Sequence, residues 1–196
     1  MRKQPEVTEK TRKAFVDVFC ELYKQKPIDK ITVQEITRRS GYNRSTFYQY
    51  FTDIYELLDY LENDVLSYAH DMPAPNIAAA QLDDVLIHRI AWLFNEKSDY
   101  LMALLGDYGS VRFTDKIKAK MMESINVASL YPADNVLLPY IQEFSVSAAV
   151  SMFRYWYRSN KSISSEELVD LIRALFTEGV LVQLRRLAIE ASNPKL

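Results

Sequence analysis

The chain has 196 residues, of which 48% are hydrophobic and 26% are charged, with 24 Lys and Arg against 26 Asp and Glu. This length and apolar content allow a sizeable core in one domain or in two small ones. With only four Gly residues to form turns, a β-sandwich or barrel is disfavoured and long helices are expected. No stretch approaches the roughly 18 consecutive apolar residues of a membrane-spanning helix, so we expect a cytoplasmic protein without membrane contact.

The net charge of -2 is unevenly distributed along the chain. Residues 1–52 hold 11 Lys and Arg against 6 Asp and Glu, a net of +5, whereas residues 53–196 hold 13 against 20, a net of -7. The positive field therefore lies at the N-terminal end, which gives modest support for nucleic-acid contact there. The predicted domains follow the same division, with a boundary between residues 52 and 53.

The first predicted element is an amphipathic helix that carries Phe15 and Leu22. Cys20, the only cysteine, lies in this helix, so no internal disulfide can form. Because its neighbours Phe19 and Glu21 would not stabilise a thiolate, we interpret Cys20 as a core or boundary residue rather than a redox sensor.

The next predicted helix begins after Thr32. Thr32 and Glu35 match a capping box, in which the hydroxyl accepts from the third helical amide and the carboxylate reaches back to the cap amide. Val33 and Ile36 form a short apolar stripe at helical spacing. Gly41 ends the helix, because Gly tolerates the positive φ that a helix C-terminus commonly requires.

A second short helix is predicted from Arg44 to Phe51, with Asn43 as its N-cap. Phe47 and Phe51 should face the core. Because only Gly41 and Tyr42 separate this helix from the one before it, the pair has the spacing of a DNA-binding helix-turn-helix.

The polar face of this hairpin carries side chains suited to bases or phosphates. Arg can donate two hydrogen bonds to guanine and Gln can pair with adenine, while hydroxyls suit phosphates or bases. The candidate DNA-binding residues are Thr32, Gln34, Arg44, Ser45, Thr46, Tyr48, Gln49 and Tyr50. The alternative is a helical hairpin with a merely solvated face, although such a face is more usually rich in Glu and Lys.

The run from Ile31 to Leu58, with the amphipathic helix before it, resembles the DNA-binding domain of TetR-family transcriptional regulators. Within the run, Thr46 and Tyr48, the aromatic Phe51 and the Leu57-Leu58 pair fall where that family has them. The resemblance covers roughly the first third of the chain. It implies that residues 1–52 form a three-helix DNA-binding domain and that residues 53–196 form a helical domain for dimerisation and effector sensing.

One position departs from the family pattern. The family often has a Lys shortly after the second helix of the hairpin, where it touches a phosphate, and this chain has Ile54 there. Tyr48, Tyr50 or Lys30 would then have to supply the missing backbone contact.

The remaining chain predicts further helices, so the expected fold class is all-α with about nine helices. Asp53 can cap a helix that ends near the prolines of residues 72–75. Later helices are expected at residues 82–95, 99–105, 114–128, 138–159 and 165–189.

The last two predicted helices are apolar on more than one side, and a helix of this kind must be buried on all of those sides. A partner chain is the simplest cover, and the resemblance implies a four-helix dimer interface. The candidate interface residues are Phe153, Trp156, Leu171, Leu175 and Phe176. The alternative is that both helices are central in a monomer.

Large apolar side chains of the middle region could line a small-molecule pocket. The candidates are Trp92, Tyr108, Phe113, Met121, Tyr140 and Phe144. An ordinary core uses the same residue types. The segment FRYWYRSN and the following SxxELVDLI also resemble the TetR-like regulators of dihydroxyacetone-kinase operons, which implies a metabolite or a protein as the signal.

No arrangement of residues suggests an enzyme. His70 and His88 lie in different predicted helices without a second ligand at metal-binding spacing, so we expect neither a metal site, a cofactor nor catalytic residues. The leading hypothesis is a homodimeric, sequence-specific regulator that binds an inverted-repeat operator, responds to an unidentified small-molecule or protein effector and represses a nearby operon. The alternative is a helical ligand- or protein-binding module, conceivably an activator, whose hairpin binds DNA weakly or not at all.

Overall fold

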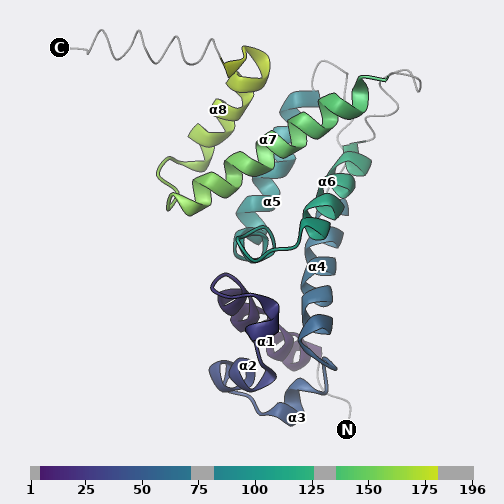
Figure 1. Cartoon of the computed structure of the whole chain (residues 1–196), viewed down its shortest axis with the longest axis vertical. Coiled ribbons are helices and arrows are strands. Elements are labelled where there is room, and N and C mark those ends of the chain that lie inside the picture. Colours follow the sequence, from purple (N-terminus) through teal and green to yellow (C-terminus); the bar gives the residue numbers. More distant parts are fainter. Residues whose placement is uncertain (1–4, 72–81, 126–135, 181–196) are drawn as a thin grey trace, which may run out of the picture. The chain divides into compact units, whose positions relative to one another are not determined.

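The computed structural model describes residues 5–71, 82–125 and 136–180 (Figure 1). In these residues the regular structure consists of eight α-helices and one 3-10 helix, with no strand. The predicted all-α fold class is confirmed, and the described part holds one α-helix fewer than the approximate number expected. No helix within these ranges has the length and apolar character needed to cross a bilayer.

The chain divides into two compact units. The first comprises Met1–Asp71 and Glu96–Lys120, and the second comprises Met72–Asn95 and Met121–Leu196. The chain passes from one unit to the other within the helices α5 (Leu82–Leu104) and α6 (Val111–Ile125).

The first unit begins with α1 (Pro5–Tyr23), a 3-10 helix (Ile28–Lys30), α2 (Val33–Ser40) and α3 (Arg44–Phe47), followed by α4 (Ile54–His70). Helix α1 packs against α2, and α2 packs against α3 (Figure 1). Phe15 of α1 is fully buried, and its ring meets that of Phe47 edge-on with centroids 5.3 Å apart. This aromatic contact anchors the short α3 to α1.

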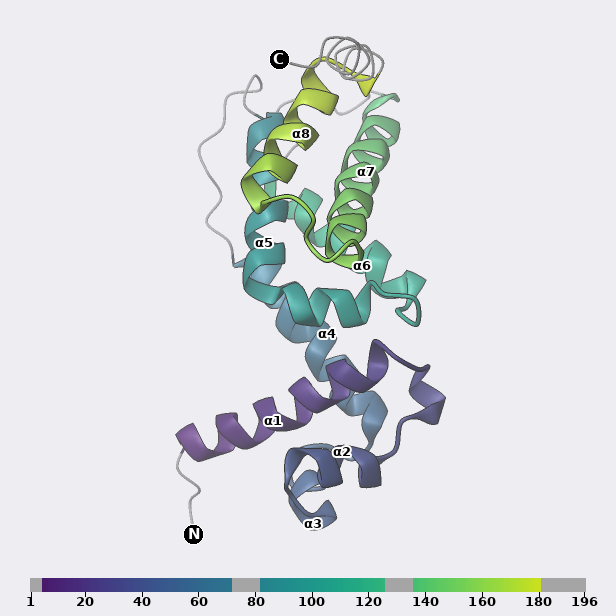
Figure 2. The ribbon, with the colours of Figure 1, turned by 90° about the vertical axis from the view of Figure 1, so that its left-hand side faces the viewer.

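The second unit contains α7 (Leu138–Arg158) and α8 (Ser165–Thr177), which lie side by side (Figure 2). Phe94 of α5 stacks on Phe153 of α7 with ring centroids 4.7 Å apart. Both rings are buried. Ser164 caps α8 in a reciprocal capping box with Glu167, which fixes the start of that helix.

Two predicted helix ends are wrong. Helix α3 ends at Phe47 instead of Phe51, because Gln49 and Tyr50 donate to carbonyls three residues back and tighten the chain into turns. The break expected between the helices at residues 82–95 and 99–105, in contrast, is present within α5 as a kink at Lys97, with φ -119 and ψ 23.

The second wrong end is that of the last helix, α8, which ends at Thr177 rather than near residue 189. Gly179 follows with φ 86 and donates to the carbonyl of Leu175, a helix-ending conformation that Gly favours. Residues 181–189 of the predicted helix lie outside the described residues, as do residues 126–128 of the helix predicted at 114–128.

Candidate nucleic-acid interface

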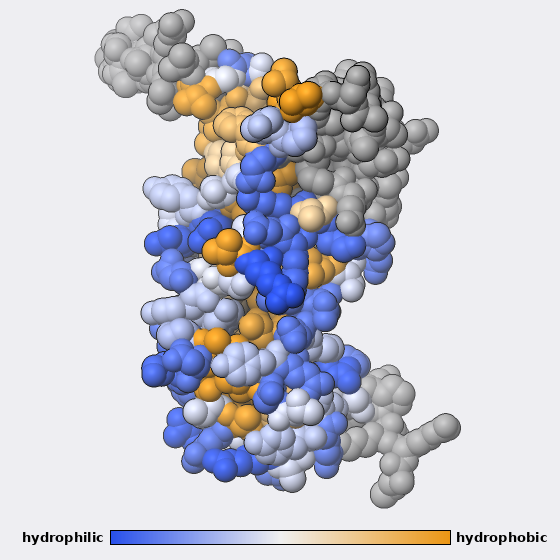
Figure 3. Space-filling model, turned by 45° about the vertical axis from the view of Figure 1, so that its right-hand side comes forward, coloured by the Kyte–Doolittle hydropathy of each residue, from blue (hydrophilic) through white to orange (hydrophobic). Residues whose placement is uncertain are grey.

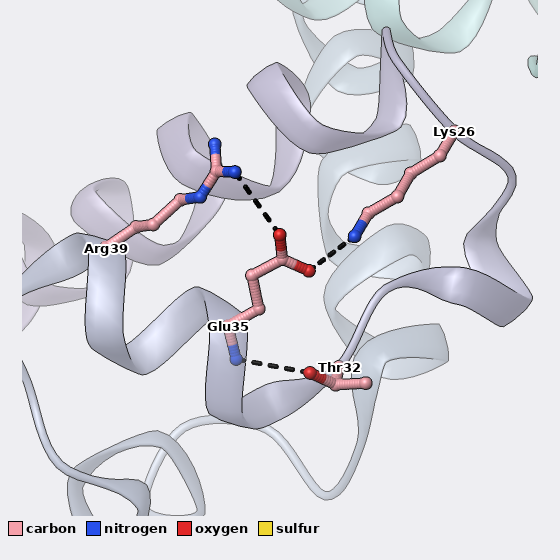
Figure 4. A network of polar contacts seen from close by, with 4 residues as sticks. All are labelled: Lys26, Thr32, Glu35 and Arg39. Carbon is pink, nitrogen blue, oxygen red and sulfur yellow. Dashed lines mark hydrogen bonds and ion pairs between the residues drawn. The ribbon is translucent and has the colours of Figure 1, made fainter.

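The start of α2 uses half of the predicted capping box (Figure 4). The Thr32 hydroxyl accepts from the backbone N–H of Glu35 at 3.2 Å, as predicted. The Glu35 carboxylate, however, binds Lys26 at 2.5 Å and Arg39 at 3.3 Å instead of reaching back to the cap amide. The prediction for that carboxylate is therefore corrected. Its hydrogen bond from Lys26 lowers the pKa of Glu35, and the ion pair ties α2 to the loop that precedes it.

The turn between α2 and α3 has the predicted form. Gly41 has φ 76, in the left-handed region, and its N–H donates to the carbonyl of Thr37. A Cβ at Gly41 would meet no atom within 4 Å, so Gly is required by the backbone conformation and not by space. Asn43 then caps α3, where its Oδ1 accepts from the N–H of Thr46 at 2.8 Å.

The buried side of the hairpin is confirmed. Phe47 is fully buried and Phe51 is 3% exposed. Tyr50 is half-buried beside Phe15, and the guanidinium of Arg12 lies 5.8 Å from the centre of its ring. Arg12 was not among the candidate residues. Its position three residues before Phe15, on the same side of a helix, could have indicated it.

The predicted DNA-binding residues are largely exposed: Thr32, Gln34, Arg44, Ser45, Tyr48 and Gln49 are exposed, and Thr46 and Tyr50 are half-buried. Direct contact joins Gln34 and Arg44, since Arg44 Nη2 donates to Gln34 Oε1 at 2.8 Å. This bond connects the beginnings of α2 and α3. The hairpin thus presents a guanidinium beside a neutral amide on its polar surface.

The hydroxyls of the hairpin differ in what they can still donate. Ser45 and Thr46 both donate to Asn43 Oδ1, at 2.7 and 2.8 Å. The ring of Tyr48 packs edge-on against Phe47 with 57% of the residue exposed, and its hydroxyl has no hydrogen-bond partner among the described residues. Because a phosphate oxygen only accepts, Tyr48 can donate to it without losing another bond, whereas Ser45 and Thr46 would each have to give up the bond to Asn43.

Ile54 is the first residue of α4 and is half-buried. Asp53 caps this helix as predicted and accepts from the N–H groups of Tyr55 and Glu56 at 2.8 and 2.9 Å. Lys30, one of the residues considered as a substitute phosphate contact, is exposed and lies 3.5 Å from Asp29.

The candidate effector-site residues are distributed over both units. Tyr108 and Phe113 belong to the first unit, where Phe113 is fully buried, whereas Trp92, Tyr140 and Phe144 belong to the second unit. Tyr140 and Phe144 are 74% and 66% exposed on α7. The side chain of Met121 lies outside the described residues. The structure therefore does not gather these residues within one unit.

The candidate dimer-interface residues also separate into two groups. Phe153 and Trp156 are buried, and the indole N–H of Trp156 donates to the carbonyl of Ile163 at 2.7 Å. Their side chains are thus already covered by their own chain, which leaves little of their surface for a partner. Leu171 is 39% exposed, and Leu175 and Phe176 are half-buried on α8.

A hollow of about 510 Å³ in the first unit has a mainly polar lining. In this lining Lys13 pairs with Asp17, and Lys24 pairs with Asp99. In the described ranges no group of three or more His, Cys, Asp or Glu side chains could hold a metal ion.

Cys20 is 2% exposed, and burial raises the pKa of its thiol.

Comparisons with known proteins agree with this geometry. Residues 16–61 match the model of the bacterial regulatory proteins of the tetR family. No curated protein matches the chain. A TetR transcriptional regulator from Streptococcus agalactiae is 19% identical, with a TM-score of 0.57 over 84% of this chain and 92% of that one.

Two further solved structures have the same fold. A tetR-family regulator from Streptomyces coelicolor is 19% identical, with a TM-score of 0.56 over 94% of this chain and 93% of that one. The dihydroxyacetone kinase operon activator DhaS is 17% identical, with a TM-score of 0.52 over 88% of this chain and 97% of that one. Residues 16–61 are therefore similar to the DNA-binding domain of the tetR family, and the solved structures show that the chain shares the fold of TetR-family regulators.

Proposed function

We propose that the protein acts as a homodimer that binds an inverted-repeat operator and represses a nearby operon until an effector changes its affinity for DNA. The observation that carries this proposal is the capped hairpin. Arg44, the first residue of α3, and Tyr48, which follows its last residue, are exposed, whereas Phe47 is buried in the core. A two-fold dimer presents two such helices. The operator half-sites should then lie about one helical turn, roughly 34–36 Å, apart or somewhat more.

In this proposal Arg44 and Tyr48 have different roles. Arg44 donates two hydrogen bonds to a guanine, and Tyr48 donates to a phosphate. Arg44→Ala should therefore cost roughly 1–3 kcal/mol on the selected operator and relax the preference at one base pair per half-site. Tyr48→Phe should weaken binding to operator and random DNA about equally.

The experiment is a titration of each variant on the operator and on a scrambled duplex, after selection of bound sequences from a random pool. Equal weakening of Arg44→Ala on both duplexes would show that Arg44 only contacts phosphate. A change confined to one base position for Tyr48→Phe would overturn its assignment to the backbone.

The dimer is supported by an exposed, largely apolar face of α7. Tyr140, Ile141, Phe144 and Tyr155 are between 58% and 76% exposed and recur along one helix, with Leu171 of α8 exposed as well. Figure 3 shows that hydrophobic residues, in orange, are exposed among hydrophilic ones on the face that it draws. We assign these residues to the interface with a second copy, in place of Phe153 and Trp156. A monomeric mass at micromolar concentration would contradict the assignment.

The effector site remains a proposal with two separate candidate positions, Trp92 in the second unit and Tyr108 with Phe113 in the first, since Tyr140 and Phe144 are now assigned to the dimer interface. An effector can alter DNA binding only if it binds two conformations with different affinity. DNA titrations of Trp92→Ala and of Tyr108→Ala, each with and without candidate metabolites, test the two positions. If these variants respond as the parent does, the effector binds elsewhere; a response only to a protein partner would replace the pocket with a surface.

A second candidate function is a helical binding module with little DNA affinity. The observation that favours it is Ile54, the first residue of α4, which stands where TetR-family regulators often have a Lys that touches a phosphate. The two functions differ in salt dependence, because phosphate contacts make DNA affinity fall steeply as salt rises. The sign of regulation is tested separately with a reporter under the selected operator, where higher expression in the presence of the protein would indicate an activator.

A further inference from the structure

A hydrogen bond joins the two helices of the hairpin, and what we infer from it rests on the proposed function that this hairpin reads DNA. Gln34 stands in the first turn of α2, and Arg44 is the first residue of α3. Arg44 Nη2 donates to Gln34 Oε1 at 2.8 Å, and both side chains are exposed. The residues are ten positions apart, so the contact depends on the fold of the hairpin and not on helical periodicity.

The chemistry of the guanidinium gives this contact a directional consequence. Arg has five N–H donors in a rigid planar fork. Two of its edges can donate two parallel bonds, one through Nε and Nη2 and the other through Nη1 and Nη2, and each edge uses a different Nη2 proton. An acceptor on one Nη2 proton therefore occupies one edge and leaves the other intact.

The Gln34 side chain is also neutral, so the positive charge of Arg44 remains available for DNA. Among the described residues Arg44 forms no ion pair, whereas Arg39 of the same hairpin lies 3.3 Å from the Glu35 carboxylate. A neutral acceptor orients the guanidinium without cancelling its charge. Holding a long side chain in one orientation before binding also reduces the conformational freedom that it loses in the complex.

We propose that Gln34 is a positioning residue for Arg44: it occupies one edge of the guanidinium and leaves a single edge to read a guanine, and so sets the base preference at that position. Gln34 acts through Arg44 and does not itself read that base pair. Its side-chain NH₂ group faces away from the guanidinium and retains its donors for a neighbouring phosphate.

The test compares Gln34→Met, which keeps the length of the side chain but removes the acceptor, with Arg44→Ala and with the double variant. Affinities are measured on the selected operator and on duplexes substituted at each position of a half-site. Gln25→Met makes the same chemical change at an exposed residue outside the hairpin helices and serves as the matched control. Thermal unfolding of each variant checks that the fold is intact.

Gln34→Met should reduce the preference at the Arg44 base pair by roughly twofold to tenfold, the effect of losing one ordinary hydrogen bond. In the Arg44→Ala background the same substitution should change the preference by less than about twofold, because its target is gone. Gln25→Met should leave every preference unchanged. Gln34→Glu should weaken binding to all duplexes, since its carboxylate pairs with Arg44 and repels phosphate.

Two results would overturn the inference. A loss of preference at a different base pair, additive with Arg44→Ala, would show that Gln34 reads DNA directly. An unchanged preference in Gln34→Met would show that the contact is incidental. If the parent protein selects no sequence from the random DNA pool, the proposed function itself is wrong. That result is obtained before any variant is compared.

Discussion

The hydroxyl of Tyr100 on α5 donates a 2.9 Å hydrogen bond to Asp17 of α1. The other carboxylate oxygen of Asp17 binds Lys13 at 2.6 Å. Close by, the kink residue Lys97 pairs with Asp64 of α4 at 2.7 Å, and its ammonium lies 5.5 Å from the centre of the Tyr100 ring. The C-terminal half of α5 is thus bound to both α1, which supports the hairpin, and α4, which follows it.

Tyr100→Phe should destabilise the protein by about 1 kcal/mol at pH 7, because Asp17 loses one donor and keeps Lys13. Burial, followed by the hydrogen bond to Asp17, raises the pKa of Tyr100. The folded state therefore retains a proton that the unfolded chain releases above about pH 10, and stability falls as the pH rises through that range. Denaturant unfolding at pH 7 and pH 11 should show a smaller alkaline loss in Tyr100→Phe. An equal loss in the variant would contradict the assignment.

Phe153→Ala should affect folding stability and Tyr155→Ala should affect dimerisation, although the two residues lie only two positions apart on α7. Phe153 is 1% exposed and stacks on Phe94, so its truncation should cost about 3–5 kcal/mol of folding free energy. Tyr155 is 76% exposed, so its truncation should leave the stability of one chain within about 0.5 kcal/mol and weaken dimerisation.

Sedimentation equilibrium and denaturant unfolding, both at several protein concentrations, separate the two effects, because dimer dissociation makes stability depend on concentration. If Tyr155→Ala dimerises as tightly as the parent, this side chain does not belong to the interface.

Glu35→Gln should remove part of the acid sensitivity of the protein. The hydrogen bond from Lys26 lowers the pKa of Glu35, so its stabilising effect is present above the unfolded value of about 4.3 and is lost as the pH falls through the folded pKa. Unfolding free energies measured between pH 7 and pH 3 should fall less steeply for the variant. Thr32→Ala is the control: it should cost about 1 kcal/mol at every pH, since the hydroxyl of the N-cap does not titrate.

Cys20 should react slowly with a thiol reagent in the native protein. It is the only cysteine, it is 2% exposed, and burial raises its pKa, so little thiolate is present at neutral pH. In denaturant the thiol should react at the rate of a free cysteine, and in native buffer the rate should report opening of α1. Rapid stoichiometric labelling of the folded protein would show that Cys20 is accessible.

The hairpin could be predicted from the sequence because its signals are local. A cap at Thr32, a left-handed Gly41 and a cap at Asn43 each act within four residues, and the structure has all three. The partner of Glu35 could not be predicted, since Lys26 is brought to it by the preceding loop. The end of α3 at Phe47 could not be predicted either, because the segment has no Gly or Pro there and the helix ends through the turn hydrogen bonds of Gln49 and Tyr50.

The second unit was less predictable, because a helix that is apolar on several sides does not indicate which side faces its own chain. Phe153 and Trp156 are turned inward, and Tyr140, Phe144 and Tyr155 outward. The stacking of Phe153 on Phe94 of α5 and the hydrogen bond from Trp156 to Ile163 identify the inward side of α7. The same ambiguity explains why residues predicted for a single pocket are found in both units.

The central claim is that the hairpin binds DNA specifically through base and phosphate contacts. The most direct test is the dissociation constant for the selected operator and for a scrambled duplex, measured at a series of salt concentrations. We predict that log K falls linearly with log salt for both duplexes with a slope of several units, and that the operator is bound at least about 10³-fold more tightly at physiological salt. A slope near zero, or equal affinity for the two duplexes, would contradict the account.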